Sequence, residues 1–206
     1  MLGPDGALAL YRAMLLDALA TTAALARDDR VVEVSFDRPW TPDPPFDRPC
    51  AALERSAQGP GDLGERLVRA ARGARRAGSD GTLFLGADAP TLPGERIEDA
   101  FGALAGGADV VLGPASDGGY VFIGVARPVT APFEGIPWGG PEVFARTRDR
   151  ARAAGLTVAE VPGGDDVDNG DDLARLLGET TAASVRKRCP ATVAWCDAYR
   201  ASRPEI

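Results

Sequence analysis

The sequence predicts an α/β fold, a doubly wound and mostly parallel sheet with helices on both faces. Strand-like and helix-like segments alternate along the chain, which is typical of such sheets. Two runs, GTLFLGA (81–87) and ADVVLGPA (108–115), are apolar at almost every position, as expected of central strands covered on both faces. No repeat or low-complexity linker interrupts the 206 residues, so we expect a single domain spanning 1–206.

The elements follow one another with recognisable start signals. Gly3-Pro4-Asp5 opens a helix that runs to about residue 26, and Asp62 is placed to cap a helix that ends near residue 77. The other expected helices are 95–105, 141–155, one that opens in the acidic corner 165–172, and 190–202. The expected strands are 31–36, 81–87, 108–115, 120–126 and 156–161. Because alternating folds usually begin with a strand and this chain begins with a helix, the first strand is expected to be missing.

Composition excludes several classes of function. The formal charge of −7 disfavours a nucleic-acid partner, which would need a basic face. The chain contains no histidine, so Ser-His and Cys-His nucleophilic schemes and histidine-bound metals are excluded. Its three cysteines form no CxxC pair, which fits a reducing cytoplasm, and no run of about 18 apolar residues predicts a membrane span. We therefore expect a cytoplasmic protein with no membrane association.

Acidic residues follow three of the predicted strands. Asp88 comes after 81–87, Asp117 lies in the turn after 108–115, and Asp168 follows 156–161. Ligands of open α/β sheets lie beyond the carboxyl ends of the strands, so these carboxylates would meet in one crevice. Carboxylates there suit Mg²⁺ or Mn²⁺, which would hold phosphate oxygens. The alternative is that each residue is an ordinary turn former or helix cap.

Two glycine-rich segments are further candidates. In SDGGY (116–120), Gly118 and Gly119 allow close approach of a ligand to the backbone, but Asp-Gly is also a standard hairpin signal. In FEGIPWGGPEV (133–143), Trp138 has a ring that could stack on a base or sugar. Packing of the loop onto the domain is an equally good interpretation of Trp138.

Four blocks in this order resemble a bacterial family of glycosyltransferase-A-fold proteins: GADAPTLP (86–93), VVLGPASDGGYVFIGV (110–125), FEGIPWGGPEV (133–143) and DDVDNGDDL (165–173). Members of that family are often labelled arsenosugar-biosynthesis or radical-SAM-associated glycosyltransferases. They are distant relatives of the molybdopterin and phospholactate nucleotidyltransferases. The resemblance covers nearly the whole chain, including GPGDLGERL (59–67), and implies a fold like that of nucleotide-diphospho-sugar transferases.

The resemblance also implies roles for individual residues. Asp88 and Asp168 look like the two metal-binding carboxylates, and Asp117 looks like the catalytic residue. The residues implied to shape the substrate side of the crevice are Gly118, Gly119, Tyr120 and Trp138. The sequence departs from the family at DVDNGDDL, where relatives resemble DVDTPEDL. It also starts at MLGPDGALALYRAMLLDAL, without the opening strand and the KxPxPGxxKTRL-like loop that cradles phosphates in relatives.

The function implied is a metal-dependent transferase that acts on a nucleotide-activated sugar or a phosphorylated small metabolite. The transferred group is a glycosyl or a nucleotidyl group, and the partners are a nucleotide or nucleotide-sugar and a small-molecule acceptor. The alternative is a catalytically impaired short form that serves as a binding or oligomerisation module. Strand edges left open by a missing strand would favour a homodimer or another element that covers them.

Overall fold

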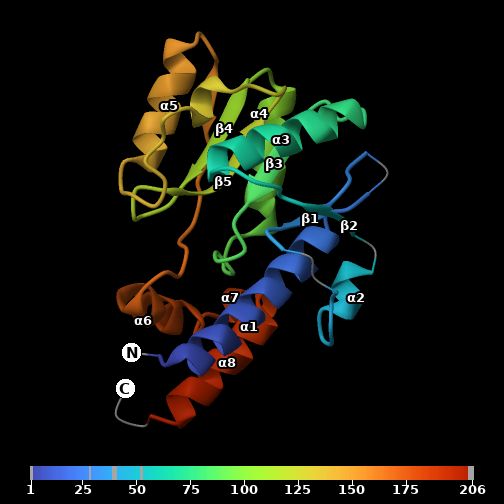
Figure 1. The fold of residues 1–206 in the computed structure, drawn as a ribbon. Helices are drawn as coiled ribbons and strands as arrows, with labels where there is room; N and C mark the ends of the chain where they lie inside the picture. The colour runs from blue at the N-terminus through green and yellow to red at the C-terminus, as the bar shows by residue number, and fades with distance from the viewer. Residues whose placement is uncertain (1, 28, 39–40, 52, 204–206) are drawn as a thin grey trace.

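The computed structural model describes residues 2–27, 29–38, 41–51 and 53–203 (Figure 1). Its helices are α1 (Pro4–Ala23), α2 (Asp47–Cys50), α3 (Leu63–Arg76), α4 (Gly94–Ala105), η1 (Ala131–Phe133), α5 (Val143–Ala153), α6 (Gly170–Glu179), α7 (Ala183–Arg188) and α8 (Pro190–Ala201). Its strands are β1 (Glu33–Phe36), β2 (Glu54–Ala57), β3 (Thr82–Leu85), β4 (Val110–Pro114), β5 (Tyr120–Val125) and β6 (Val158–Glu160). The expected helices and strands are all present, and the sequence pattern missed β2 and the short helices α2, η1 and α7.

The α/β fold class is confirmed, and the pairing of its strands is mixed. The main sheet has the order β3-β5-β4-β6, in which β4 and β6 are parallel. Strand β5 runs antiparallel to both β3 and β4, where the sequence predicted mostly parallel pairing. The reason is the connection between β4 and β5, which is too short for the crossover that parallel neighbours need and reverses the chain instead. Strands β1 and β2 pair in parallel as a separate two-stranded sheet.

Helices cover both faces of the main sheet. On one face, Val110 and Leu112 of β4 pack with residues of α3, η1 and α5. On the other face, Val111 of the same strand packs with α4 and the segment that precedes it. All three valine and leucine side chains are fully buried, as the continuous apolar run predicted.

The N-terminal helix and the C-terminal helices form a second packed region beside the sheet, at the bottom of Figure 1. Helix α1 lies along α8, and Leu10 and Met14 pack with residues of α6 and α8. The buried carboxylate of Asp17 accepts hydrogen bonds from the N–H groups of Ala191 and Thr192 at 3.1 and 2.7 Å, and so caps α8 from α1. Within the described residues, no helix has the length and apolarity needed to cross a membrane.

Candidate functional site

Three strands of the main sheet end at the same edge. Strands β3 and β4 both run against β5, and β6 is parallel to β4, so β3, β4 and β6 point the same way. Asp88 lies three residues beyond β3, and Asp117 lies three residues beyond β4. Asp166 and Asp168 follow β6 in the segment that leads to α6. The topology therefore brings the predicted carboxylates to one edge of the sheet, as expected from their positions after strands that point the same way.

The SDGGY segment is the tight hairpin turn that joins β4 to β5. The carboxylate of Asp117 accepts a hydrogen bond from the N–H of Gly119 at 2.8 Å, which closes the turn. Gly118 has a φ of +92°, and a Cβ atom there would lie 2.0 Å from the carbonyl oxygen of Pro141. The N–H of Phe144 donates to the carbonyl of Gly118 at 2.9 Å. Gly118 thus allows the turn to pack against the residues that lead into α5, and the N–H of Gly119 holds the carboxylate of Asp117.

The acidic corner reaches Asp117 because the chain after β6 crosses the end of β4 closely. A Cβ atom on Gly163 would lie 2.1 Å from the carbonyl oxygen of Pro114, so only glycine permits this crossing. The corner then brings together the carboxylates of Asp117, Asp166 and Asp168, with one oxygen from each within 4.8 Å of the others. Asp88 is outside this group of three but interacts electrostatically with each of its members.

The other polar residues of the corner have structural partners. Asn169 is the N-cap of α6 and accepts hydrogen bonds from the N–H groups of Asp171 and Asp172. Asp172 accepts in return from the N–H groups of Asp168 and Asn169, and it pairs with Arg175 at 3.0 Å. Arg175 also pairs with Asp165 at 3.3 Å. Capping and ion pairing therefore account for Asp165, Asn169 and Asp172. They do not account for the carboxylates of Asp166 and Asp168.

Electrostatics shows that negative charge accumulates at this edge. Burial, and after it the neighbouring carboxylates of Asp117, Asp168 and Asp88, raise the pKa of Asp166 to about 6 against the lowering effect of a backbone hydrogen bond. Burial also raises the pKa of Asp88, with contributions from Asp168 and Asp117. Carboxylates with raised pKa values next to one another are characteristic of sites that bind a cation or handle protons.

The three clustered residues fit a divalent cation. Mg²⁺ is bound by carboxylate oxygens at about 2.0–2.1 Å, so oxygens that share one ion lie within about 4.2 Å of one another. One oxygen from each of Asp117, Asp166 and Asp168 lies within 4.8 Å of the others, which is close to that spacing. A cation would also relieve the repulsion that raises the pKa of Asp166.

Tyr120 and Trp138 lie behind the turn, packed against the apolar cluster that joins the sheet to α3 and α5. The Cζ2 atom of Trp138 would be 3.1 Å from a Cβ atom on Gly64, so its ring lies against the start of α3. The Nε1 of Trp138 is buried without a hydrogen-bond partner among the described residues. Burial raises the pKa of the Tyr120 hydroxyl, against the lowering effect of a hydrogen bond with Thr147. Their predicted contact with substrate stays a prediction.

Two residues near the acidic edge were not assigned from the sequence. Asp166 lies in the acidic corner 165–172 and has no role assigned from the sequence, because its proximity to Asp117 depends on the crossing at Gly163. Tyr11 of α1 is 47% exposed. Partial burial raises the pKa of its phenol most, and the negative charge of Asp88 raises that pKa as well. Helix α1 therefore borders the acidic edge, and no local sequence signal indicates that neighbourhood.

Comparison with known proteins agrees with this architecture. Residues 18–140, more than half of the chain, match the model of a family described as "Uncharacterized protein conserved in bacteria (DUF2064)". The chain belongs to this family. Among solved structures, the DUF2064 chain is similar to a "putative nucleotide-diphospho-sugar transferase" from Desulfovibrio desulfuricans G20. The two share 32% sequence identity with a TM-score of 0.81, over 97% of this chain and 86% of the other.

The likeness confirms the expected nucleotide-diphospho-sugar-transferase-like fold for this DUF2064 protein. None of the curated proteins matches it. The match of 18–140 contains Asp88 and the Asp117–Trp138 region, whereas Asp166 and Asp168 lie beyond it. The acidic corner therefore lies outside the matched residues in sequence, but in the structure it meets Asp117 of the matched part at the edge of the sheet.

Proposed function

We propose that this protein is a metal-dependent transferase that acts on a nucleotide-activated sugar or a phosphorylated small metabolite. One observation carries the proposal: the carboxylates of Asp117, Asp166 and Asp168 cluster at the carboxyl edge of the sheet, with Asp88 beside them. The similarity to a protein described as a nucleotide-diphospho-sugar transferase supports the substrate class. The similarity does not distinguish glycosyl transfer from nucleotidyl transfer.

In this proposal Asp117, Asp166 and Asp168 hold Mg²⁺ or Mn²⁺, with Asp88 beside them as a further ligand or as a partner of bound water. The cation would neutralise the phosphate oxygens of a bound diphosphate. The hairpin turn holds Asp117 in place, because its carboxylate is fixed by the N–H of Gly119. Asn169 and Asp172 fix the backbone on either side of Asp168 through the cap of α6.

Apart from the cation, the protein would accelerate the reaction mainly by positioning the donor and the acceptor. Transfer from an activated phosphate requires the acceptor oxygen to be aligned with the donor, and fixed dipoles and charges stabilise the transition state. The exposed phenol of Tyr11 on α1 borders Asp88 and is available to contact the donor or the acceptor from the side opposite the sheet.

Cation binding is the first test. We expect Mg²⁺ or Mn²⁺ to raise the thermal unfolding temperature of the wild-type protein and to do so much less for Asp168→Asn. Asp171→Asn is the matched control, because Asp171 is exposed in the same corner and lies outside the clustered three. Equal cation-dependent stabilisation of Asp168→Asn and the wild type would contradict the assignment.

The reaction is tested by product release. Nucleotidyl transfer from a nucleoside triphosphate releases pyrophosphate, and glycosyl transfer from a nucleotide-sugar releases a nucleoside diphosphate. We expect one of these products with Mg²⁺ or Mn²⁺ when a panel of nucleotides, nucleotide-sugars and small acceptors is supplied. If the protein binds the cation but neither product forms across the panel, the non-catalytic binding module becomes the better explanation.

A further inference from the structure

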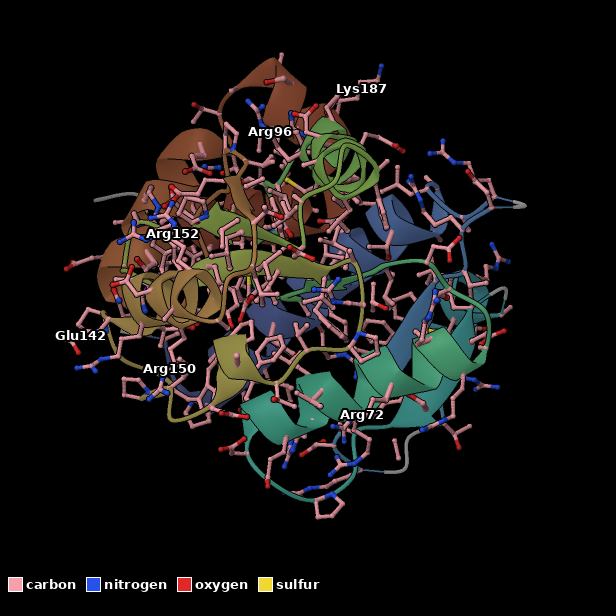
Figure 2. The ribbon with its side chains drawn as sticks, turned by 90° about the horizontal axis from the view of Figure 1, so that it is seen from above. Arg72, Arg96, Glu142, Arg150, Arg152 and Lys187 are labelled. Atoms are coloured by element: carbon pink, nitrogen blue, oxygen red, sulfur yellow. The ribbon has the colours of Figure 1, made fainter. Side chains whose placement is uncertain are left out.

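Helix α3 carries a stripe of charged residues along its exposed side, while its buried residues Gly64, Val68 and Ala71 lie on another face. Residues 62, 65, 69, 72 and 76 are spaced by three, four, three and four positions, so they lie along one face of the helix. The residues in that stripe are Asp62, Glu65, Arg69, Arg72 and Arg76. All five line a cavity of about 620 Å³ between α3 and residues 130–135. Figure 2 shows Arg72 on α3 and the η1 segment alongside the helix.

The basic half of the stripe is not neutralised by nearby carboxylates. Arg69 donates to the carbonyl oxygens of Gln58 and Pro60 at 2.6 and 2.8 Å, so its guanidinium is oriented but keeps its charge. Arg72 and Arg76 form no ion pair or hydrogen bond with other residues in the described part of the chain. Three guanidinium groups therefore line the cavity without an ion pair to any carboxylate in the described part of the chain.

The acidic half has a different character. Asp62 and Glu65 form the capping box of α3, in which each carboxylate accepts a hydrogen bond from the other's backbone N–H. Glu134 lines the cavity from the opposite wall. The side chains of Val68 and Phe133 are buried and give the cavity an apolar part. The cavity thus combines guanidinium donors, carboxylate acceptors and an apolar surface.

We propose that this cavity is a binding site for a phosphorylated small molecule, separate from the acidic edge of the sheet. Phosphate oxygens accept several hydrogen bonds at once, and guanidinium groups are the side chains best suited to supply them. Hydroxyl groups of the same ligand would donate to the carboxylates. The volume is in the range of about 300–1,000 Å³ that is usual for small-molecule sites. The overall charge of −7 disfavours a long polyanion at this face.

The test uses the full-length protein in EDTA, so that no divalent cation at the acidic edge contributes. The probes are inorganic diphosphate and glucose 1-phosphate, measured by isothermal titration calorimetry at low and moderate salt. Comparing them distinguishes a site for free polyphosphate from one for a phosphorylated sugar. The test variant is Arg72→Gln with Arg76→Gln, because glutamine has nearly the helix propensity of arginine.

Two controls separate this site from the rest of the protein. Arg75→Gln removes an arginine of the same helix that pairs with Asp80 and does not line the cavity. Asp168→Asn alters the acidic edge. We expect at least one probe to bind the wild type and both controls with equal affinity, and the double variant to bind it at least about tenfold more weakly.

Three results would overturn the proposal. The first is that neither probe binds the wild type at millimolar concentration. The second is that the double variant binds a probe with the same affinity as the wild type. The third is that binding is lost in Asp168→Asn alone. Circular dichroism of the double variant checks that α3 remains folded. Because the readout is anion binding without a divalent cation, failure here leaves the transferase proposal standing, and failure of the transferase proposal leaves this one standing.

Discussion

Replacing Asp166 by asparagine is expected to make the metal-free protein more stable at neutral pH. The pKa of Asp166 is raised from 3.8 to about 6, mainly by burial and then by the adjacent carboxylates. A carboxylate whose pKa is higher in the folded state favours folding only while it is protonated. Its contribution is fully present below about pH 3.8 and is lost as the pH rises through about 6. At neutral pH the charged Asp166 therefore destabilises the fold.

The size of the effect follows from the difference between the two pKa values. A change from 3.8 to about 6 corresponds to about 3 kcal/mol at most. Asp166 is only partly buried, so solvent screens much of that energy and about 1 kcal/mol is the reasonable expectation. For a chain of this size, 1 kcal/mol corresponds to a rise in melting temperature of about 2–4 °C.

Urea denaturation in EDTA measures this difference, with Asp171→Asn as the control for removal of an exposed charge. Asp166→Asn should gain stability at pH 7.5, and most of the gain should disappear at about pH 4, where the wild-type carboxylate is protonated in the folded state. A loss of stability at pH 7.5, or a gain that is the same at both pH values, would refute the reasoning. With saturating Mg²⁺ the order should reverse, because the wild type alone keeps all three clustered ligands.

Other substitutions test the scaffold, each measured by the free energy of unfolding. Glu98→Gln removes the ion pairs of Glu98 with Arg27 and Arg30. These arginines lower the pKa of Glu98 from 4.5 to about 2, so Glu98 stabilises the folded state only while it is charged. The difference in free energy of unfolding between the variant and the wild type should therefore vanish as the pH falls from about 4.5 through about 2. Gly118→Ala should destabilise the folded protein by about 3 kcal/mol or more, because the new Cβ atom would overlap the carbonyl of Pro141. Gly102→Ala is the matched control on an open helix surface, and it should stabilise the folded protein by about 0.5–1 kcal/mol. Asp17→Ala should destabilise by about 3 kcal/mol, because two N–H groups at the start of α8 lose their acceptor.

The sequence predicted the elements of the sheet better than their pairing. The apolar run at 108–115 and the capping signal at Asp62 are local features, and both are confirmed by β4 and by the capping box of α3. The direction of β5 depends on the length of one connection, for which Asp-Gly gave the correct hairpin signal. The assumption of a mostly parallel sheet outweighed that signal. Strand β2, with sequence ERSA, has no apolar alternation and gave no signal at all.

The sequence likewise predicted only the part of the candidate site that depends on strand direction. Carboxylates that follow parallel strands must reach the same edge, so the neighbourhood of Asp88, Asp117 and Asp168 could be inferred from strand direction. The inclusion of Asp166 depends on a backbone crossing at Gly163, and the approach of Tyr11 depends on the packing of α1 against α8. Both are tertiary contacts between distant segments, which periodicity and composition do not encode.

The acidic edge and the arginine-lined cavity both gather charged groups that form no ion pair among the described residues. At the edge these are the carboxylates of Asp117, Asp166 and Asp168, and in the cavity they are the guanidinium groups on the exposed side of α3. Departures of this kind in an otherwise consistent fold are expected at functional sites. The edge gathers carboxylates and suits a cation, whereas the cavity combines three arginines with three carboxylates and suits a ligand that carries both phosphate and hydroxyl groups. A phosphorylated ligand would contact the edge only through a cation, but it would contact the arginines directly. Binding with and without a divalent cation therefore separates the two sites.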